Sequence, residues 1–288
     1  MTDELKLLSP QEFPPLLREI PGPPKQLYVR GEMPSTEYKW LAVVGSRAMT
    51  TYGKAACKYL IEGLRGYPIV IVSGLAYGVD AEAHKAALDT GLTTVAVPGS
   101  GLDWDVLYPR AHVGLAREIL KAGGCLLSEF KPEQKAADYT FPQRNRIMAG
   151  LSHATLVIEA KEKSGSLITA KLVTEYNREL LVVPGSIFSP ESKGTHQFLR
   201  LGATPITSPE DILMALGITK REGARSLNEL RDDLSPDELR VFEIIHSPVS
   251  HDELISELGL PITEANVLLS TMEIKGLIVE ELGVVRVR

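Results

Sequence analysis

Six short apolar runs recur along this sequence, and each is followed directly by glycine, serine, proline or glutamate. The runs occupy residues 41–44, 69–72, 93–97, 125–127, 154–158 and 180–183. Segments with helical patterning lie between them at 51–64, 81–88, 115–121 and 167–177. Continuous apolar runs of this length are typical of parallel strands buried on both faces of a sheet, with helices as crossovers. The pattern predicts an α/β fold built on a doubly wound, mostly parallel sheet.

The chain divides by composition into four parts. Residues 1–39 are proline-rich and too short for a core of their own, so we expect them to drape over the main domain. Residues 40–217 form the expected α/β core, closed by a short helix at 209–217, and residues 218–234 form a charged linker. Residues 235–288 show helical patterns at 239–245, 251–258 and 264–275, then a hairpin about Gly283. Three helices and a hairpin indicate a small C-terminal winged-helix domain.

Charge is distributed unevenly along the chain. The net charge of the whole sequence is −6, which argues against a protein that coats nucleic acid generally. Residues 226–288 hold 5 basic and 13 acidic side chains, a net charge of −8. Residues 1–225 hold 26 basic and 24 acidic side chains, a net charge of +2. Any polyanion should therefore meet the first part of the chain.

The sequence shows no sign of a membrane segment, an export signal or a metal site. No apolar run approaches the roughly 20 residues of a membrane span, and the acidic first residues lack the basic start of a signal peptide. Cys57 and Cys125 have no ligand-type spacing, so we expect two buried, reduced thiols. We expect a cytoplasmic protein without a metal.

Small and polar residues follow the apolar runs, at the sheet edge where doubly wound folds bind ligands. Gly45, Ser46 and Arg47 follow one run, Ser73 and Gly74 follow the next, and Ser164-Gly165-Ser166 opens a later helix. Their backbone N–H groups and hydroxyls could bind a phosphate; plain turns and a serine N-cap are the alternatives. No GxGxxG and no GxxxxGK[ST] motif is present, so we expect no nicotinamide, flavin or P-loop nucleotide cofactor.

The stretch from Phe141 to Ser152 is the strongest pointer to nucleic acid. It places Arg144, Asn145 and Arg146 shortly after an aromatic residue and a proline. Arginine donates several hydrogen bonds to phosphate and keeps its charge, and the face of Phe141 could stack a base. A solvated helix start with a structural salt bridge, and a core role for the aromatic ring, are the alternatives.

A series of ordered motifs resembles the DNA-processing protein A (DprA, also called Smf) family over residues 28–210. The motifs are Gly45-Ser46-Arg47 with Thr50 and Tyr52-Gly53; Ser73-Gly74-Leu75-Ala76-Tyr77-Gly78-Val79-Asp80 with Ala83-His84; Gly99 and Gly101-Leu102 with Tyr108-Pro109; Ser128-Glu129; the Phe141–Ser152 stretch; Glu159-Ala160; Ser164 to Ala170; and Val183-Pro184-Gly185.

The resemblance implies an extended Rossmann-like core that binds single-stranded DNA, pairs as a homodimer and loads the RecA recombinase in natural transformation. It implies binding and mediation without established catalysis. With the residues above, it gives a DNA- and phosphate-binding set of Gly45, Ser46, Arg47, Ser73, Gly74, Phe141, Arg144, Asn145, Arg146, Ser164, Gly165, Ser166, Thr169 and Lys171.

Two other classes of function compete with this hypothesis. A nucleotide-phosphate hydrolase of the lysine-decarboxylase-like Rossmann group could use Asp80, Glu129 and Glu159 as acid, base or metal ligands. Capping and ion pairs with arginine are the more ordinary roles for those carboxylates, and a structural role is the more ordinary one for His84. An interaction hub is the third class, favoured for the acidic C-terminal part.

Overall fold

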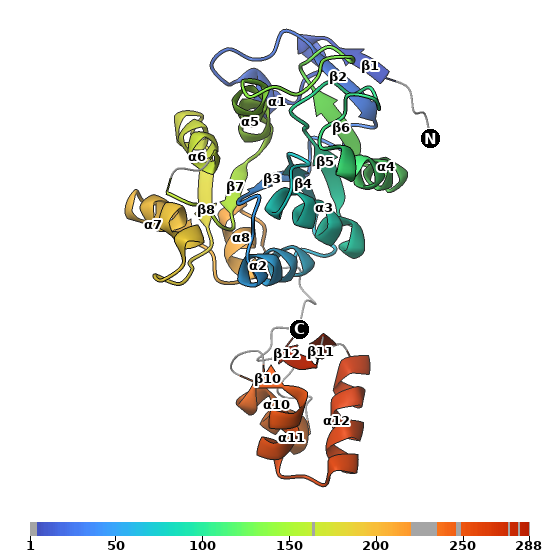
Figure 1. Cartoon of the computed structure of the whole chain (residues 1–288), viewed down its shortest axis with the longest axis vertical. Coiled ribbons are helices and arrows are strands. Elements are labelled where there is room, and N and C mark those ends of the chain that lie inside the picture. Colours follow the sequence, from blue (N-terminus) through green and yellow to red (C-terminus); the bar gives the residue numbers. More distant parts are fainter. Residues whose placement is uncertain are drawn as a thin grey trace. The chain divides into compact units, whose positions relative to one another are not determined.

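The computed structural model describes residues 5–162, 165–219, 235–245, 249–275, 277–281 and 283–287. The chain forms two compact units, Met1–Thr219 and Lys220–Arg288 (Figure 1). Most of the expected linker, residues 220–234, lies outside the described residues. Within the described residues, no helix is long and apolar enough to cross a membrane.

A nine-stranded sheet organises the larger unit, in the order β1-β2-β6-β5-β4-β3-β7-β8-β9. The strands from β3 to β9 run parallel, whereas β1 and β2 pair antiparallel with each other and β2 pairs antiparallel with β6. The six expected strands are β3 to β8, which confirms the doubly wound, mostly parallel sheet. The strand bounds are β1 Leu5–Leu8, β2 Leu27–Gly31, β3 Lys39–Val44, β4 Ile69–Ser73, β5 Thr93–Ala96, β6 Cys125–Ser128, β7 Ala154–Val157, β8 Glu179–Val182 and β9 Thr204–Pro205.

Helices cover both faces of this sheet, because both faces of its central strands are apolar. In β3, Trp40, Ala42 and Val44 pack into one core cluster, and Leu41 and Val43 pack into the opposite one. The first cluster contains residues of α1, α5, α6 and α7, and the second contains residues of α2, α3 and α8. The bounds are α1 Pro15–Arg18, α2 Thr51–Glu62, α3 Val79–Thr90, α4 Val113–Lys121, α5 Thr140–Leu151, α6 Ser166–Glu175, α7 Lys193–Arg200 and α8 Pro209–Ala215, with 3-10 turns at Pro10–Glu12, Arg110–His112 and Pro190–Ser192.

Residues 5–39 of the proline-rich segment are part of the main domain and do more than drape over it. They supply β1 and β2 to the sheet, and Leu17 and Leu27 are fully buried in the first core cluster. The reason is the apolar content between the prolines, which only the large core can bury, because so short a segment cannot enclose a core alone.

The smaller unit has the three helices and the hairpin expected of a winged helix. Ser235 caps α10 (Pro236–Ile244) in a capping box with Glu238, and Ser250 caps α11 (His251–Leu258). The third helix is α12 (Ile262–Ile274), and a small sheet has the order β10-β12-β11. Its strands are β10 Val249–Ser250, β11 Ile278–Glu281 and β12 Val284–Val287, with Gly283 at a positive φ of 76° in the hairpin turn.

Candidate nucleic-acid interface

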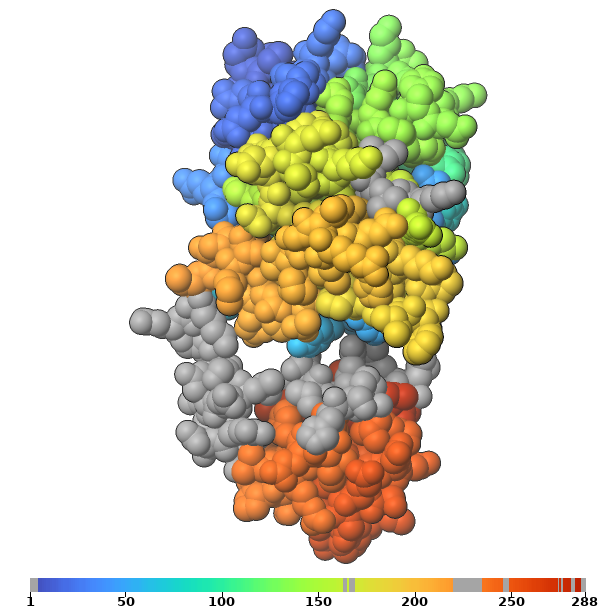
Figure 2. Space-filling model, turned by 90° about the vertical axis from the view of Figure 1, so that its left-hand side faces the viewer, coloured from blue at the N-terminus to red at the C-terminus, as the bar shows by residue number. Residues whose placement is uncertain are grey.

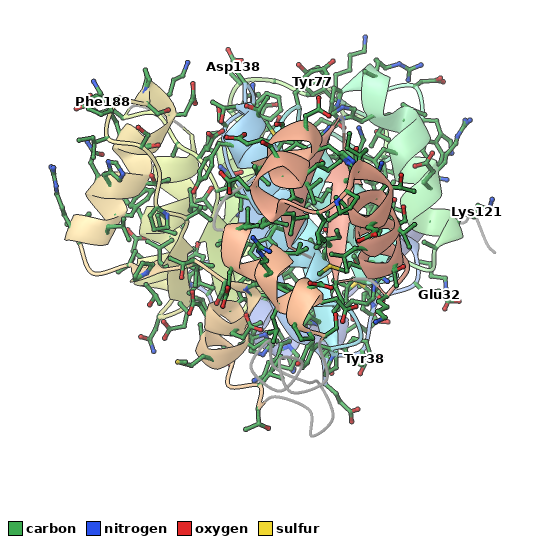
Figure 3. The ribbon with its side chains drawn as sticks, turned by 90° about the horizontal axis from the view of Figure 1, so that it is seen from below. Glu32, Tyr38, Tyr77, Lys121, Asp138 and Phe188 are labelled. Atoms are coloured by element: carbon green, nitrogen blue, oxygen red, sulfur yellow. The ribbon has the colours of Figure 1, made fainter. Side chains whose placement is uncertain are left out.

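An open pocket of about 510 Å³ lies where the strand order of the larger unit reverses. The chain proceeds from β3 outward to β6 on one side and from β7 outward to β9 on the other, so β3 and β7 flank the switch point. The segments that follow these two strands line the pocket together with α5 and the start of α6. Ligands of doubly wound sheets bind at this position. Figure 3 shows Tyr77 and Asp138 at this edge of the molecule and Tyr38, which precedes β3, at the opposite edge.

The pocket gathers eight members of the predicted set from three separate segments. They are Gly45, Ser46, Arg47, Phe141, Arg144, Asn145, Gly165 and Thr169. The pocket is also lined by residues that we did not predict as binding residues: Val44, Ala48, Ala76, Asp80, Asp138, Pro142, Met148 and Lys161. Lys161 is the one cation among these additional residues; its side chain is 59% exposed, and its Nζ lies 3.1 Å from Glu191 Oε1. Its position shortly after β7 was the signal that could have found it.

The exposed Arg47 and the half-buried Phe141 form a cationic wall of the pocket. The guanidinium carbon of Arg47 lies 5.0 Å from the centre of the Phe141 ring, which is a cation–π geometry. The other neighbour of the ring is Tyr108, with 5.7 Å between centroids. Phe141 is half-buried, and a Cβ at Gly99 would lie 2.6 Å from its ring. Its aromatic face is therefore held in place beside a charged group without being enclosed in the core.

Arg144 lies at the floor of the pocket, in a buried pair with Asp80. The side chains are 5% and 8% exposed, and Arg144 Nη1 lies 3.7 Å from Asp80 Oδ2. Nη1 also donates to the Val97 carbonyl at 2.9 Å, and Asp80 Oδ2 accepts the Gly74 N–H at 3.1 Å. Burial raises the pKa of Asp80, and the charge of Arg144 opposes that rise. Both groups thus have structural partners even where they border the pocket.

Gly74 is required by this pair, because a methyl group at that position would overlap the Arg144 guanidinium. Its N–H is donated to Asp80, so the turn does not offer that N–H to a ligand. The neighbouring Ser73 is fully buried and donates its hydroxyl to the Val43 carbonyl at 2.7 Å. Ser73 and Gly74, at the end of β4, therefore lie behind the residues that line this pocket and do not line it themselves.

Arg146 and Lys171 do not line the pocket. Arg146 pairs with Glu129 and donates to the Gly22 carbonyl at 2.7 Å, which connects α5 to the N-terminal segment. Burial raises the pKa of Glu129, and Arg146 opposes that rise. Lys171 is exposed on α6. Ser164 lies outside the described residues; Ser166 begins α6, but its side chain is outside the description too.

The three candidate catalytic carboxylates have capping and pairing roles, as their more ordinary interpretation predicts. Glu159 accepts from the Thr50 N–H at 2.9 Å and from the Thr50 hydroxyl at 2.5 Å, at the start of α2. Asp80 and Glu129 pair with Arg144 and Arg146. His84 is buried with Nδ1 2.7 Å from Thr94 Oγ1, and burial lowers its pKa to about 3. Among the residues that the structure describes, no group of three or more histidine, cysteine or acidic side chains could hold a metal.

Family models match both units of the chain. The model of DNA recombination-mediator protein A matches residues 5–217, and the model of the DprA winged helix domain matches residues 225–283. Protein Smf of Escherichia coli is 43% identical over 201 residues, which are 70% of this chain and 53% of that protein. This chain therefore spans about half the length of that relative. The DNA processing protein DprA of Streptococcus pneumoniae is 41% identical over 70% of each chain.

Two solved structures have the same fold as the larger unit. The X-ray structure of DprA from S. pneumoniae has a TM-score of 0.69 at 39% identity and covers 73% of this chain and 74% of that one. The DprA structure from Helicobacter pylori has a TM-score of 0.65 at 30% identity, over 74% of this chain and 95% of that one. That structure is described in terms of the single-stranded DNA binding mode of the H. pylori protein.

Proposed function

Because the chain belongs to the DNA recombination-mediator protein A family, we propose that it binds single-stranded DNA and mediates recombination with it. The single observation that carries this proposal is the pairing of Arg47 with the face of Phe141 at an open pocket on the switch point of the sheet. The single-stranded DNA binding described for the H. pylori relative supports it.

The pocket has the two chemical elements that a single strand needs. Arg47 and Lys161 are exposed cations that can attract phosphates, and they lie on opposite sides of the switch point, one after β3 and the other after β7. Phe141 offers an aromatic face, which accepts any base. Asn145 and the backbone around Gly45 and Gly165 add polar groups at the same edge. Such a site would bind a flexible strand better than a duplex, whose bases are already stacked on one another.

We propose that the protein acts by binding, without catalysis. Asp80, Glu129 and Glu159 are the carboxylates that a nucleotide-phosphate hydrolase could use, and each has an arginine or helix-capping partner. A carboxylate whose oxygens are engaged in this way is not placed to accept a proton from a substrate, because a general base must lie within hydrogen-bond reach of that proton. Turnover of nucleotides with and without magnesium tests this part, and hydrolysis that depends on Asp80 or Glu159 would contradict it.

The finer role that we propose is that of a cytoplasmic homodimer that protects incoming strands in natural transformation and delivers them to RecA. Two copies would hold one strand at two pockets. Strand β8 has no free edge for such pairing, because β9 pairs with Leu181 and Val182. Helix α7 could supply a face for pairing instead, and Figure 2 shows it (amber) next to α6 (yellow) on one face. Phe188 and Leu201 flank α7 and are 89% and 82% exposed.

We propose that the winged helix contacts protein partners and does not hold DNA by itself. Residues 226–288 have a net charge of −8, which repels phosphates. A recognition helix normally carries several cations, whereas Lys275 is the one cation of residues 264–275. Its Nζ already lies 2.7 Å from Glu238 Oε1.

Fluorescence anisotropy of labelled single-stranded and duplex DNA tests the main proposal. We expect preferential binding of the single strand and a loss of affinity in Arg47→Ala. Arg65→Ala is the matched control, because Arg65 is exposed on the larger unit and does not line the pocket. Equal binding of duplex and single strand, or equal effects of the two substitutions, would contradict the proposal.

A further inference from the structure

A second pocket of about 360 Å³ lies next to the first and shares two lining residues with it, Asp138 and Phe141. It lies between residues 105–110, which follow β5, and residues 135–138, which precede α5. Its volume is within the range of small-molecule sites. Because Phe141 borders both pockets, a strand that passes over this ring would place adjacent nucleotides on its two sides.

The second pocket has walls that suit a planar ring. Tyr108 is 40% exposed, and its ring meets that of Phe141 at an interplanar angle of 58° with 5.7 Å between centroids. Leu107, Ala136 and Ala137 complete an apolar lining. A phosphate placed here would lose water without gaining polar partners from these side chains, whereas a base would exchange water for aromatic and aliphatic contacts.

The charges around the second pocket also argue against a phosphate site. Asp105 and Asp138 oppose Arg110 and Lys135, so its ionisable lining carries no net charge. The guanidinium of Arg110 already donates to the Trp104 carbonyl. An ionised carboxylate only accepts hydrogen bonds, and the amino group N4 of cytosine has an N–H on its C5 side, away from any carbonyl oxygen. The one donor of thymine, its ring N3–H, lies between two carbonyl oxygens, which repel an approaching carboxylate.

From this juxtaposition we propose that the second pocket is a nucleobase subsite, and that Asp105 favours a cytosine there over a thymine. This inference rests on the proposed function, because it assigns the base next to the nucleotide whose phosphate lies beside Arg47. Binding in the first pocket accounts for affinity toward any strand. The second pocket adds a preference that depends on the base.

The test compares oligo-dC with oligo-dT, each about twelve nucleotides long, in anisotropy titrations of the full chain at neutral pH and constant salt. We expect the wild type to bind oligo-dC about fivefold more tightly, which is the scale of one added hydrogen bond. Asp105→Ala should reduce this preference to below about twofold. Glu133→Ala is the matched control, because Glu133 is exposed in the same segment but lines neither pocket, and it should retain the preference.

A second variant tests occupancy of the pocket independently of charge. Ala136→Leu adds volume to the lining and should weaken binding of both oligomers by about threefold or more, whereas Ala122→Leu, outside both pockets, should not. Equal affinity of the wild type for the two oligomers, an unchanged preference in Asp105→Ala, or no effect of Ala136→Leu would overturn the subsite. Failure of the proposed function has a different signature: the wild type would bind neither oligomer, or Arg47→Ala would bind both as tightly as the wild type does.

Discussion

Replacing Arg144 with methionine should destabilise the larger unit by about 3–5 kcal/mol, because it removes the partner of a buried carboxylate. The Arg144 and Asp80 side chains are 5% and 8% exposed, so water cannot replace the missing charge. The substitution also removes the hydrogen bond to the Val97 carbonyl. Methionine preserves the length and apolar stem of the side chain, which limits the cavity. Urea denaturation of the full chain, read on the transition of the larger unit, measures the change.

A double substitution separates the charge from the packing. Asp80→Asn keeps a side-chain oxygen that can accept the Gly74 N–H but carries no charge, so combining it with Arg144→Met should recover about 2 kcal/mol of the loss. Arg47→Ala is the control for removal of an exposed arginine and should change the free energy of unfolding by less than about 0.5 kcal/mol. A loss below about 1 kcal/mol in Arg144→Met, or no recovery in the double variant, would refute the pairing.

The Arg144–Asp80 pair also predicts how the free energy of unfolding should change with pH. Burial raises the pKa of Asp80 and Arg144 opposes that rise, so without Arg144 the folded-state pKa should be higher still. A carboxyl group whose pKa is raised by folding stabilises the fold below its unfolded pKa of about 3.9, and that contribution is lost as pH rises through the folded value. The stability deficit of Arg144→Met relative to wild type should therefore be smaller at pH of about 5 than at about 8. A deficit that does not change with pH would show that Asp80 is not the group left without a partner.

Three further outcomes follow from the two units and the pocket. Gly74→Ala should destabilise the larger unit, because the new methyl group overlaps Arg144, whereas Gly114→Ala in α4 meets nothing within 4 Å and should be neutral or stabilising in thermal melts. Phe141→Ala should weaken single-strand binding by about 1–3 kcal/mol with an unchanged salt slope, because stacking is not ionic; cooperative loss of folding would instead assign the ring to the core. A chain ending near Gly217 should keep most single-strand affinity, and a fragment starting at Ser226 should show none. Tight DNA binding by that fragment would contradict the assignment of DNA binding to the larger unit.

The central sheet could be predicted because its strands are apolar on both faces and end in turn-forming residues. The two antiparallel strands could not: β1 is half exposed, β2 ends at the positive φ of Gly31, and both lie in a proline-rich segment. Helix α5 could not be predicted from periodicity either, since it places Arg144 and Gly150 on its buried side. Apolar periodicity is weak wherever an ion pair takes the place of an apolar residue.

About half of the predicted site lines the pocket, and helical geometry accounts for part of the remainder. Residues two positions apart on an α-helix lie about 200° apart around its axis, so Arg144 and Arg146 cannot both face one pocket. The same holds for Thr169 and Lys171 on α6. Sequence alone does not say which member of such a pair faces the ligand. Sequence alone also does not say whether a serine at a strand end faces a ligand. The hydroxyl of Ser73 instead donates to the neighbouring strand, at the Val43 carbonyl.

The salt dependence of single-strand affinity tests the central claim most directly. If phosphates bind beside Arg47, the logarithm of the affinity should fall linearly with the logarithm of the salt concentration, by about 0.7 for each neutralised phosphate on a single strand. Arg47→Ala should therefore bind more weakly and show a slope reduced by about 0.7, while Arg65→Ala keeps the slope of the wild type. Salt-independent binding, or an Arg47→Ala slope equal to that of the wild type, would contradict the account.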